Sequence, residues 1–294
     1  MEELQKIIRK NRPDGPILKQ CKGDFGMEYL TFPTLEDTGI VEHLFTTRLG
    51  GVSEGVLGTM NLSFQRGDDE SNVLENYRRV AKALHCWPDD IVCSHQTHTT
   101  NIRKVTAADR GKGVIRPRDY SDIDGLITDE QGIALATFFA DCVPLYFVDK
   151  THKAIGLAHS GWRGTVSKMG AAMCRRMEEE YGTRPKDLIA AIGPSICVNC
   201  YEVSEDVAEL FFQMLQKMEL SDERKKDVVK PGKAPGKYQL DLWLANELIL
   251  LEAGVPKKQI SVTDICTCHN PEYLFSHRAS QGRRGNLGAF LMLK

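Results

Sequence analysis

Residues 133–160 read IALATFFADCVPLYFVDKTHKAIGLAHS, and this stretch decides the fold. It contains three short apolar runs, at residues 133–139, 143–148 and 154–158. Asp141-Cys142 separates the first two runs, and the polar residues 149–152 separate the second and third. Apolar runs of this length, bounded by polar turns, predict consecutive strands buried deep in a sheet.

Helices and strands are mixed on both sides of this stretch, without strict alternation. Helical spacing and capping residues predict helices over 72–85, capped by Asn72, and over 165–181, ending at Gly182. Further helices are expected over 204–218 and over 241–253, the latter capped by Asp241. Strands are expected at residues 17–21, 28–32, 42–47, 188–192, 260–262 and 289–293. A short amphipathic helix is expected before the first strand, and 221–237 is expected to be an exposed loop. The chain is therefore predicted to be α+β, and residues 1–294 to form a single domain of mixed sheets flanked by helices.

Composition excludes several classes of protein. The 294 residues carry 38 Lys and Arg against 40 Asp and Glu, a formal charge of −2, which argues against a nucleic-acid or membrane-surface binder. No run approaches the roughly 20 apolar residues of a membrane span, and the charged N-terminus lacks the apolar core of a signal peptide. We therefore expect a cytoplasmic protein. The nine cysteines are an odd number in a large chain, so a disulfide framework is not expected.

Three short segments could carry chemistry: residues 94–98 (SHQTH), 140–144 (ADCVP) and 158–164 (AHSGWRG). Cys142 and His159 lie 17 residues apart, so a strand, a tight turn and a returning strand would place them side by side at one end of a sheet. His98 ends its own strand-like run. Two imidazoles and one thiolate suit Zn²⁺ and leave a fourth position open, as catalytic zinc sites do; copper would also tolerate this set.

Spacing alone leaves other interpretations open. These residues could be a buried cysteine and hydrogen-bonded core histidines. Cys142 could also be a nucleophile with His159 as its base, oriented by Asp141 or another polar group, which would make the protein a cysteine hydrolase. A separate zinc site could use the pair Cys197 and Cys200 with the segment 266–269 (CTCH). The spacing of Cys266 and Cys268 is poor for zinc, and independent buried cysteines are favoured there.

Arginines beside glycines are candidate anion ligands. Arg48 precedes Gly50-Gly51, Arg163 lies within residues 161–164 (GWRG), and Arg278 follows residues 275–277 (FSH). Guanidinium groups match phosphate oxygens, although each of these arginines could equally be a surface residue in a turn. Arg283 and Arg284 are expected to lie in a solvated loop.

Together these segments resemble the laccase-domain, or YfiH-type, family. The resemblance covers roughly residues 40–292, and the first 40 residues are less diagnostic. The matching segments, in the order of the family, are TTRLGGVS (46–53), NL (61–62), EN (75–76), QTH (96–98), ADCVP (140–144), AHSGWRG (158–164), GP (193–194), CYEV (200–203) and FSHR (275–278). Thr99 stands where the family commonly has glycine.

The resemblance implies a fold and an activity. The family fold is a single α+β domain, and its members are regarded as zinc-containing purine nucleoside phosphorylases that act on adenosine, inosine, guanosine and methylthioadenosine with phosphate. Adenosine deamination is also attributed to them. The family's metal ligands correspond to His98, Cys142 and His159. The family's older description as a copper polyphenol oxidase is less favoured, because the chain has only eight histidines and no His-X-His pair.

Phosphorolysis requires that phosphate be held near C1′ of the ribose. Arg48 and Arg163 are the predicted phosphate ligands, and Arg278 is a third candidate for substrate contact. Gln96 would point the same way as His98 along an extended strand and is a candidate substrate contact. Asp141 could orient a ligand histidine, but adjacent side chains on a strand face opposite ways, so it could instead be structural. The expected partners are a purine nucleoside and phosphate, and the sequence does not predict the oligomeric state.

Overall fold

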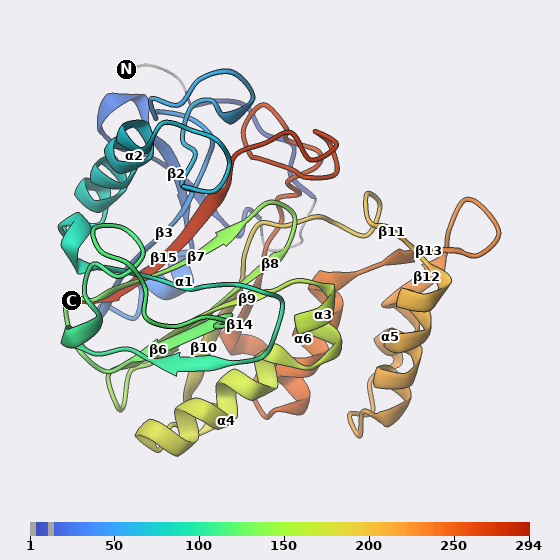
Figure 1. Ribbon diagram of the computed structural model, residues 1–294. Coiled ribbons are helices and arrows are strands. Elements are labelled where there is room, and N and C mark those ends of the chain that lie inside the picture. The colour runs from blue at the N-terminus through green and yellow to red at the C-terminus, as the bar shows by residue number, and fades with distance from the viewer. Residues whose placement is uncertain (1–3, 11–14) are drawn as a thin grey trace.

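The computed structural model describes residues 4–10 and 15–294, which form three β-sheets and six α-helices (Figure 1). The first sheet has the order β1-β2-β3-β15-β7-β4. Its strands are β1 (Lys19–Lys22), β2 (Glu28–Thr31), β3 (Val41–Thr46), β15 (Leu287–Leu293), β7 (Ala134–Phe139) and β4 (Ile91–Cys93). Strands β4 and β7 are parallel and the other pairs are antiparallel, so this is a mixed sheet.

The second sheet has the order β14-β10-β8-β9-β6-β5. Its strands are β14 (Ile260–Val262), β10 (Leu188–Ile192), β8 (Val143–Asp149), β9 (Ala154–Ser160), β6 (Gly125–Thr128) and β5 (Ile102–Lys104). A third, small sheet joins β11 (Glu202–Ser204), β13 (Lys237–Leu240) and β12 (Val229–Pro231). It lies with α5 (Glu205–Lys217) to one side of the two large sheets (Figure 1).

The three apolar runs of residues 133–160 are strands, as predicted, but they do not belong to one sheet. Strand β7 lies in the first sheet, whereas β8 and β9 pair with each other in the second. The chain crosses from one sheet to the other at Asp141, which has a left-handed backbone (φ 89°). Cys142 is therefore placed at the junction of the two sheets.

The two large sheets pack face to face, and side-chain alternation divides the core. On β8, Tyr146 and Val148 face the first sheet, while Leu145 and Phe147 face the helices on the other side. Helices α4 (Met169–Tyr181) and α6 (Leu242–Glu252) cover that outer face of the second sheet, and α2 (Glu70–Ala83) covers the outer face of the first. Because both faces of each central strand are buried, these strands are largely apolar.

Several helix limits differ from the prediction. Asp69, not Asn72, caps α2, because its carboxylate accepts a hydrogen bond from the Ser71 amide at 2.7 Å. The predicted helix 165–181 is divided into α3 (Trp162–Val166) and α4 by Lys168, which adopts a left-handed backbone (φ 58°). Gly182 and Asp241 end and cap their helices as predicted.

The N-terminal helix prediction is wrong for residues 4–10, which form no helix. Residues 1–3 and 11–14 lie outside the described residues. The short helix α1 (Pro33–Glu36) occurs later, between β2 and β3. The predicted loop 221–237 is largely exposed, but it contains a short 3-10 turn at Glu223–Asp227 and strand β12.

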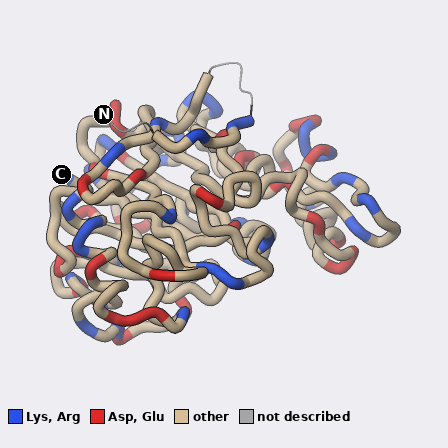
Figure 2. Tube along the Cα trace, turned by 90° about the horizontal axis from the view of Figure 1, so that it is seen from above, with Lys and Arg blue, Asp and Glu red and all other residues tan. Residues whose placement is uncertain are grey.

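Charge is dispersed over the molecule. Figure 2 shows Lys and Arg interspersed with Asp and Glu along the trace, which matches the near-neutral net charge. Within residues 4–10 and 15–294, none of the helices has both the length and the apolar character needed to cross a membrane.

Asn76 on α2 holds the loop that precedes this helix. Its side chain is fully buried and donates to Asn61 O at 2.8 Å and Ser53 Oγ at 2.9 Å, while its oxygen accepts from the Val52 amide at 2.9 Å. Removing one partner leaves buried polar groups unpaired, at a cost of about 1–3 kcal/mol each.

We predict that Asn76→Ala lowers the free energy of unfolding by about 2–3 kcal/mol, measured by urea denaturation. Asn72→Ala, one turn earlier on the same helix, is the matched control and should change stability by less than about 0.5 kcal/mol. Equal losses in the two variants would contradict this role for Asn76.

Candidate active site

The β8–β9 hairpin brings Cys142 and His159 together. The antiparallel register pairs Pro144 with His159 and Val143 with Ser160, so Cys142 lies at the same end of the sheet as His159. The donor atoms of His98, Cys142 and His159 all lie within 4.8 Å of one another. The predicted side-by-side placement of Cys142 and His159 is confirmed.

His98 reaches this cluster from a loop and not from the end of a strand. Strand β4 ends at Cys93, and His98 itself has a left-handed backbone (φ 67°). Its ring lies nearly perpendicular to that of His159, with the ring centroids 4.9 Å apart.

Asp124, immediately before β6, holds both histidines in place. This fully buried carboxylate accepts hydrogen bonds from the backbone amides of Thr97, His98 and Thr99 at 2.9–3.1 Å. It also bonds Nδ1 of His159 at 2.8 Å, which leaves Nε2 of that ring free to act as a ligand. A metal-bound histidine usually makes such a bond through its second nitrogen.

Sequence reasoning missed Asp124. The available signal was an acidic residue directly before an apolar strand (DGLIT, 124–128), which predicts a carboxylate at a strand end. Burial by itself would raise the pKa of Asp124, but hydrogen bonds from His159 and from the loop amides lower it to about 2. The carboxylate is therefore a fixed negative charge at neutral pH.

The cluster also activates its thiol. Burial would raise the pKa of Cys142, but the charge and hydrogen bonds of His159 and His98 outweigh it and lower the pKa to about 6. Burial would lower the pKa of His159, but Cys142 and Asp124 raise it to about 9. The pair thus favours a thiolate beside an imidazolium, and a thiolate is the form that binds metals.

Gly161 leaves the space that the cluster needs. A Cβ atom at this position would lie 3.0 Å from Cys142 Sγ and 3.0 Å from Cδ2 of His98. His159 is buried, Cys142 is half-buried and His98 is exposed, so the cluster is closed on one side and accessible on the other. One sulfur and two imidazole nitrogens that converge in this way fit a zinc ion with three protein ligands.

The accessible side opens into a cavity of about 330 Å³, which His98, Cys142 and His159 all line. This volume is in the range of small-molecule sites. Its other walls include the aromatic rings of Phe64, Tyr77, Phe138 and Phe139 and the guanidinium groups of Arg66, Arg118 and Arg284. The site therefore combines a wall of candidate metal ligands, aromatic surface and positive charge.

Arg284 was expected in a solvated loop, but it is half-buried in this cavity. Within the described part of the chain, its Nε atom is buried and has no hydrogen-bond partner, although the group bonds Asn286 and the Gly285 carbonyl. Burial, followed by the like charge of Arg66, lowers the pKa of Arg284 to about 10. A half-buried guanidinium that lines a cavity is suited to bind an anion.

The arginines singled out in the sequence lie outside the cavity wall. The Arg48 side chain donates to the carbonyls of Gly58 and Pro271 and packs over the Phe275 ring. Arg163 is exposed and packs over the Trp162 ring.

Arg278 holds backbone together. Its guanidinium donates to the carbonyls of Cys200 and Glu202, at 3.1 and 3.0 Å. Its own amide donates to Asp141 Oδ2 at 2.7 Å.

Gln96 lines the cavity but uses its amide elsewhere. Its nitrogen donates to the Phe138 carbonyl and its oxygen accepts from the Phe138 amide, at 2.8 and 2.7 Å. The side chain thus acts as an extra edge partner for β7. The expected extended strand through Gln96 and His98 does not form, since β4 ends at Cys93.

Asp141 does not touch the ligand histidines. Its carboxylate accepts from the Thr267 hydroxyl at 2.6 Å and from the Arg278 amide. Of the two roles considered for Asp141, these contacts match the structural one.

Comparisons with known proteins agree with this architecture. Residues 42–294 match the family described as multi-copper polyphenol oxidoreductase laccase. The chain is 37% identical over 254 residues to the purine nucleoside phosphorylase YlmD of Bacillus subtilis, covering 85% of this chain and 87% of that protein. It is 31% identical over 240 residues to a protein named adenosine deaminase RL5, from an unknown prokaryotic organism, covering 81% and 88%.

A solved structure shows the same fold. The crystal structure of YlmD from Geobacillus stearothermophilus superposes with a TM-score of 0.83 at 35% identity, covering 95% of this chain and 99% of that one. The mixed α+β fold with its Cys/His cluster, the family match and the identity to curated relatives agree. The chain belongs to the multi-copper polyphenol oxidoreductase laccase family, and within it to the purine nucleoside phosphorylases.

Proposed function

We propose that this protein is a zinc-dependent purine nucleoside phosphorylase that cleaves adenosine, inosine, guanosine or methylthioadenosine with phosphate, and that adenosine deamination is a second activity of the same site. The observation that carries the proposal is the opening of the His98–Cys142–His159 cluster into a cavity that the half-buried Arg284 also lines. The names of the curated relatives support both activities.

Zinc held by His98, Cys142 and His159 would supply Lewis-acid chemistry at this wall of the cavity. Asp124 fixes the orientation of the His159 ring and the position of His98. We assign Asp124 as a positioning residue, because it touches the ligands and does not line the cavity.

We place the phosphate beside Arg284 and Arg66, which both line the cavity. In phosphorolysis an oxygen of phosphate forms a bond to C1′ as the bond from C1′ to the purine nitrogen breaks, and the electron pair leaves with the purine. Arg284, which lines the cavity, would hold the attacking anion next to the sugar by its positive charge. Arg48, Arg163 and Arg278 remain the alternative anion ligands. The guanidinium groups of Arg48 and Arg278 already donate to backbone carbonyls, whereas that of Arg163 makes no hydrogen bond within the described part of the chain.

We place the purine against aromatic side chains of the cavity. Phe64 stacks on Tyr77, with ring centroids 5.8 Å apart, and Phe138 meets the same Tyr77 edge-on. Phe64 and Phe138 are half-buried and line the cavity, so each has ring surface available for a base.

A cysteine hydrolase is the second candidate, and one specific observation favours it. Cys142, His159 and Asp124 form a nucleophile, base and orienting carboxylate, with the last contact at 2.8 Å. This arrangement needs no metal. The two candidates therefore differ in their response to a chelator.

The first experiment incubates the purified protein with inosine and phosphate and measures hypoxanthine and ribose 1-phosphate. We expect formation of both products to depend on phosphate, to stop after zinc is removed by a chelator, and to return when zinc is restored. His98→Ala should lose the zinc of the His98–Cys142–His159 cluster and the activity together.

Hydrolysis of a thioester or amide substrate that iodoacetamide blocks and a chelator does not affect would instead establish the cysteine hydrolase. Absence of product from inosine, adenosine and methylthioadenosine in zinc-loaded protein would overturn the phosphorylase proposal.

Asp124→Asn should weaken zinc binding by about 10–100-fold, as is typical when a group that supports metal ligands is altered. The carboxylate accepts hydrogen bonds from the loop amides and from the His159 ring. An asparagine side chain has only one accepting oxygen, so its NH₂ group would face one of these two partners. The measurement is a zinc dissociation constant from competition with a fluorescent chelator. Asp122→Asn, two residues earlier on an exposed turn, is the matched control and should bind zinc normally. Equal affinity in both variants would remove Asp124 from this role.

Arg284→Gln should raise the KM for phosphate by about tenfold or more, because a charged hydrogen bond contributes about 1.5–3 kcal/mol. The KM for inosine should change much less. Arg283→Gln, the exposed neighbour outside the cavity, is the control. If Arg163→Ala raises the KM for phosphate and Arg284→Gln does not, the phosphate ligand is Arg163, as the sequence predicts, and not Arg284.

A further inference from the structure

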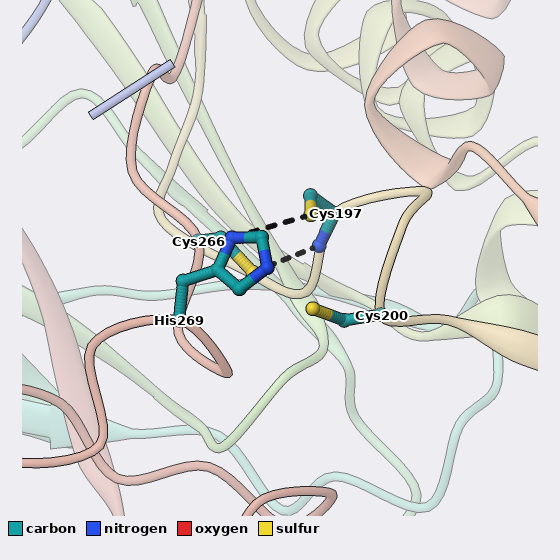
Figure 3. A group of neighbouring side chains, drawn as sticks. All are labelled: Cys197, Cys200, Cys266 and His269. Carbon is teal, nitrogen blue, oxygen red and sulfur yellow. Dashed lines mark hydrogen bonds between the residues drawn. The ribbon is translucent and has the colours of Figure 1, made fainter. Parts of the chain in front are cut away.

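A second group of metal-binding side chains lies outside the cavity. Donor atoms of Cys197, Cys200, Cys266 and His269 all lie within 4.8 Å of one another. Figure 3 shows the four side chains converging from two chain segments. Independent buried cysteines were expected here, but the structure brings three cysteines of these segments together with His269. The spacing of Cys266 and Cys268 looked poor for zinc, but the second ligand that the structure groups with Cys266 in this segment is His269.

Each segment supplies two ligands separated by two residues. In the first, the amides of Cys200 and Tyr201 both donate to the Cys197 carbonyl at 3.0 Å, which closes a tight turn. In the second, Asn270 donates from its backbone to the Thr267 carbonyl at 3.2 Å and from its side chain to the Cys266 carbonyl at 2.8 Å. Pairs with this spacing, each on a tight turn, are typical of structural zinc sites.

Neighbouring strands bring the two turns together. Strands β10 and β14 are parallel, and both turns follow their carboxyl ends at the same edge of the second sheet. A bridge joins Ser195 to Cys266, and the Thr267 amide donates to the Ser195 carbonyl at 3.1 Å. The two ligand pairs are thus held by sheet pairing before any ion is considered.

One sulfur already accepts a hydrogen bond that suits a thiolate. The Cys197 amide donates to Cys266 Sγ at 3.3 Å, and Cys197 Sγ lies 4.0 Å from Nδ1 of His269 (Figure 3). Cys197 and Cys266 are buried, Cys200 is half-buried and only His269 is exposed. Four protein donors leave no position for substrate, which distinguishes this group from the His98–Cys142–His159 cluster.

We propose that Cys197, Cys200, Cys266 and His269 form a structural zinc site, so that the protein holds two zinc ions with different roles. The four-ligand site has no part in the reaction; the total of two ions rests on the proposed function, whereas the four-ligand site itself does not. Three thiolates and one imidazole in a closed set favour Zn²⁺ over the oxygen-seeking cations Mg²⁺ and Ca²⁺.

The site would hold together the segments that support the active site. Thr267, between two residues of the second turn, donates to Asp141, the residue before Cys142. Arg278 donates to the Cys200 carbonyl of the first turn. The N-terminal segment joins the same region, since the Ile8 amide donates to the Asn270 side chain at 2.6 Å. Loss of this ion should therefore lower stability and leave the other zinc site occupied.

The test is the zinc content of the purified full-length chain, measured by elemental analysis. We expect about two zinc ions per chain in the unaltered protein, and about one in His98→Ala, in Cys200→Ser and in His269→Ala. His98→Ala with His269→Ala should bind almost none. Cys86→Ser is the control, with a half-buried thiol that belongs to neither group, and should keep both ions.

Cobalt(II) substitution gives a readout that does not require the four-ligand site to tolerate mutation. His98→Ala loaded with cobalt should show intense charge-transfer absorption from three thiolate ligands. It should also show the d–d bands of a tetrahedral site with three sulfur ligands and one nitrogen ligand. In the cobalt-loaded unaltered protein, the charge-transfer intensity should be about four-thirds of that value, because Cys142 adds one thiolate.

A single zinc ion in the unaltered protein that remains in His269→Ala would overturn the proposal. The proposal would also be overturned if His98→Ala is folded but binds neither zinc nor cobalt. This holds whether its cysteines are found as free thiols or in a disulfide. Neither result would bear on phosphorolysis, which is measured separately.

Discussion

The buried carboxylate of Asp124 is the interaction on which the active site depends. A negative charge without solvent must be compensated, and here three loop amides, the Thr99 hydroxyl and the His159 ring all bond to it. Satisfying this one charge fixes the His98 loop and the His159 ring together. The geometry of the ligand cluster therefore follows from the hydrogen-bonding needs of a residue that binds neither metal nor substrate.

The crossing between the two large sheets is a second constraint. The chain leaves β7 and enters β8 through Asp141 in a left-handed conformation, which places Cys142 where the sheets meet. Asp141 is held by Thr267 and by the Arg278 amide, so segments near the C-terminus set the position of a ligand in the middle of the chain. The four-ligand Cys/His group is joined to these contacts at two points. Cys266 is next to Thr267 in the chain, and the Cys200 carbonyl accepts a hydrogen bond from Arg278. The group can therefore support the reactive site without touching it.

The two Cys/His groups illustrate how surroundings decide the role that a candidate metal site could take. His98, Cys142 and His159 are three donors beside a cavity with aromatic and cationic walls, so they can hold a metal that meets substrate. Cys197, Cys200, Cys266 and His269 are four donors on two tight turns away from that cavity. Ligand number and access to the cavity, more than ligand identity, separate the two roles.

The sequence by itself determined the mixed α+β class, most strands, and Cys142 with His159, because apolar runs and a hairpin register are local properties. It did not determine which sheet each strand joins, since both faces of these strands are apolar. Tertiary structure decided the surroundings of Asp124 and Arg284 and the pairing of Cys266 with His269. Burial and long-range contacts set the environment of a carboxylate, a guanidinium or a thiol, and these are not local properties of the sequence. Arg48 and Arg278 look like anion ligands in the sequence, but the fold directs their guanidinium groups to backbone carbonyls.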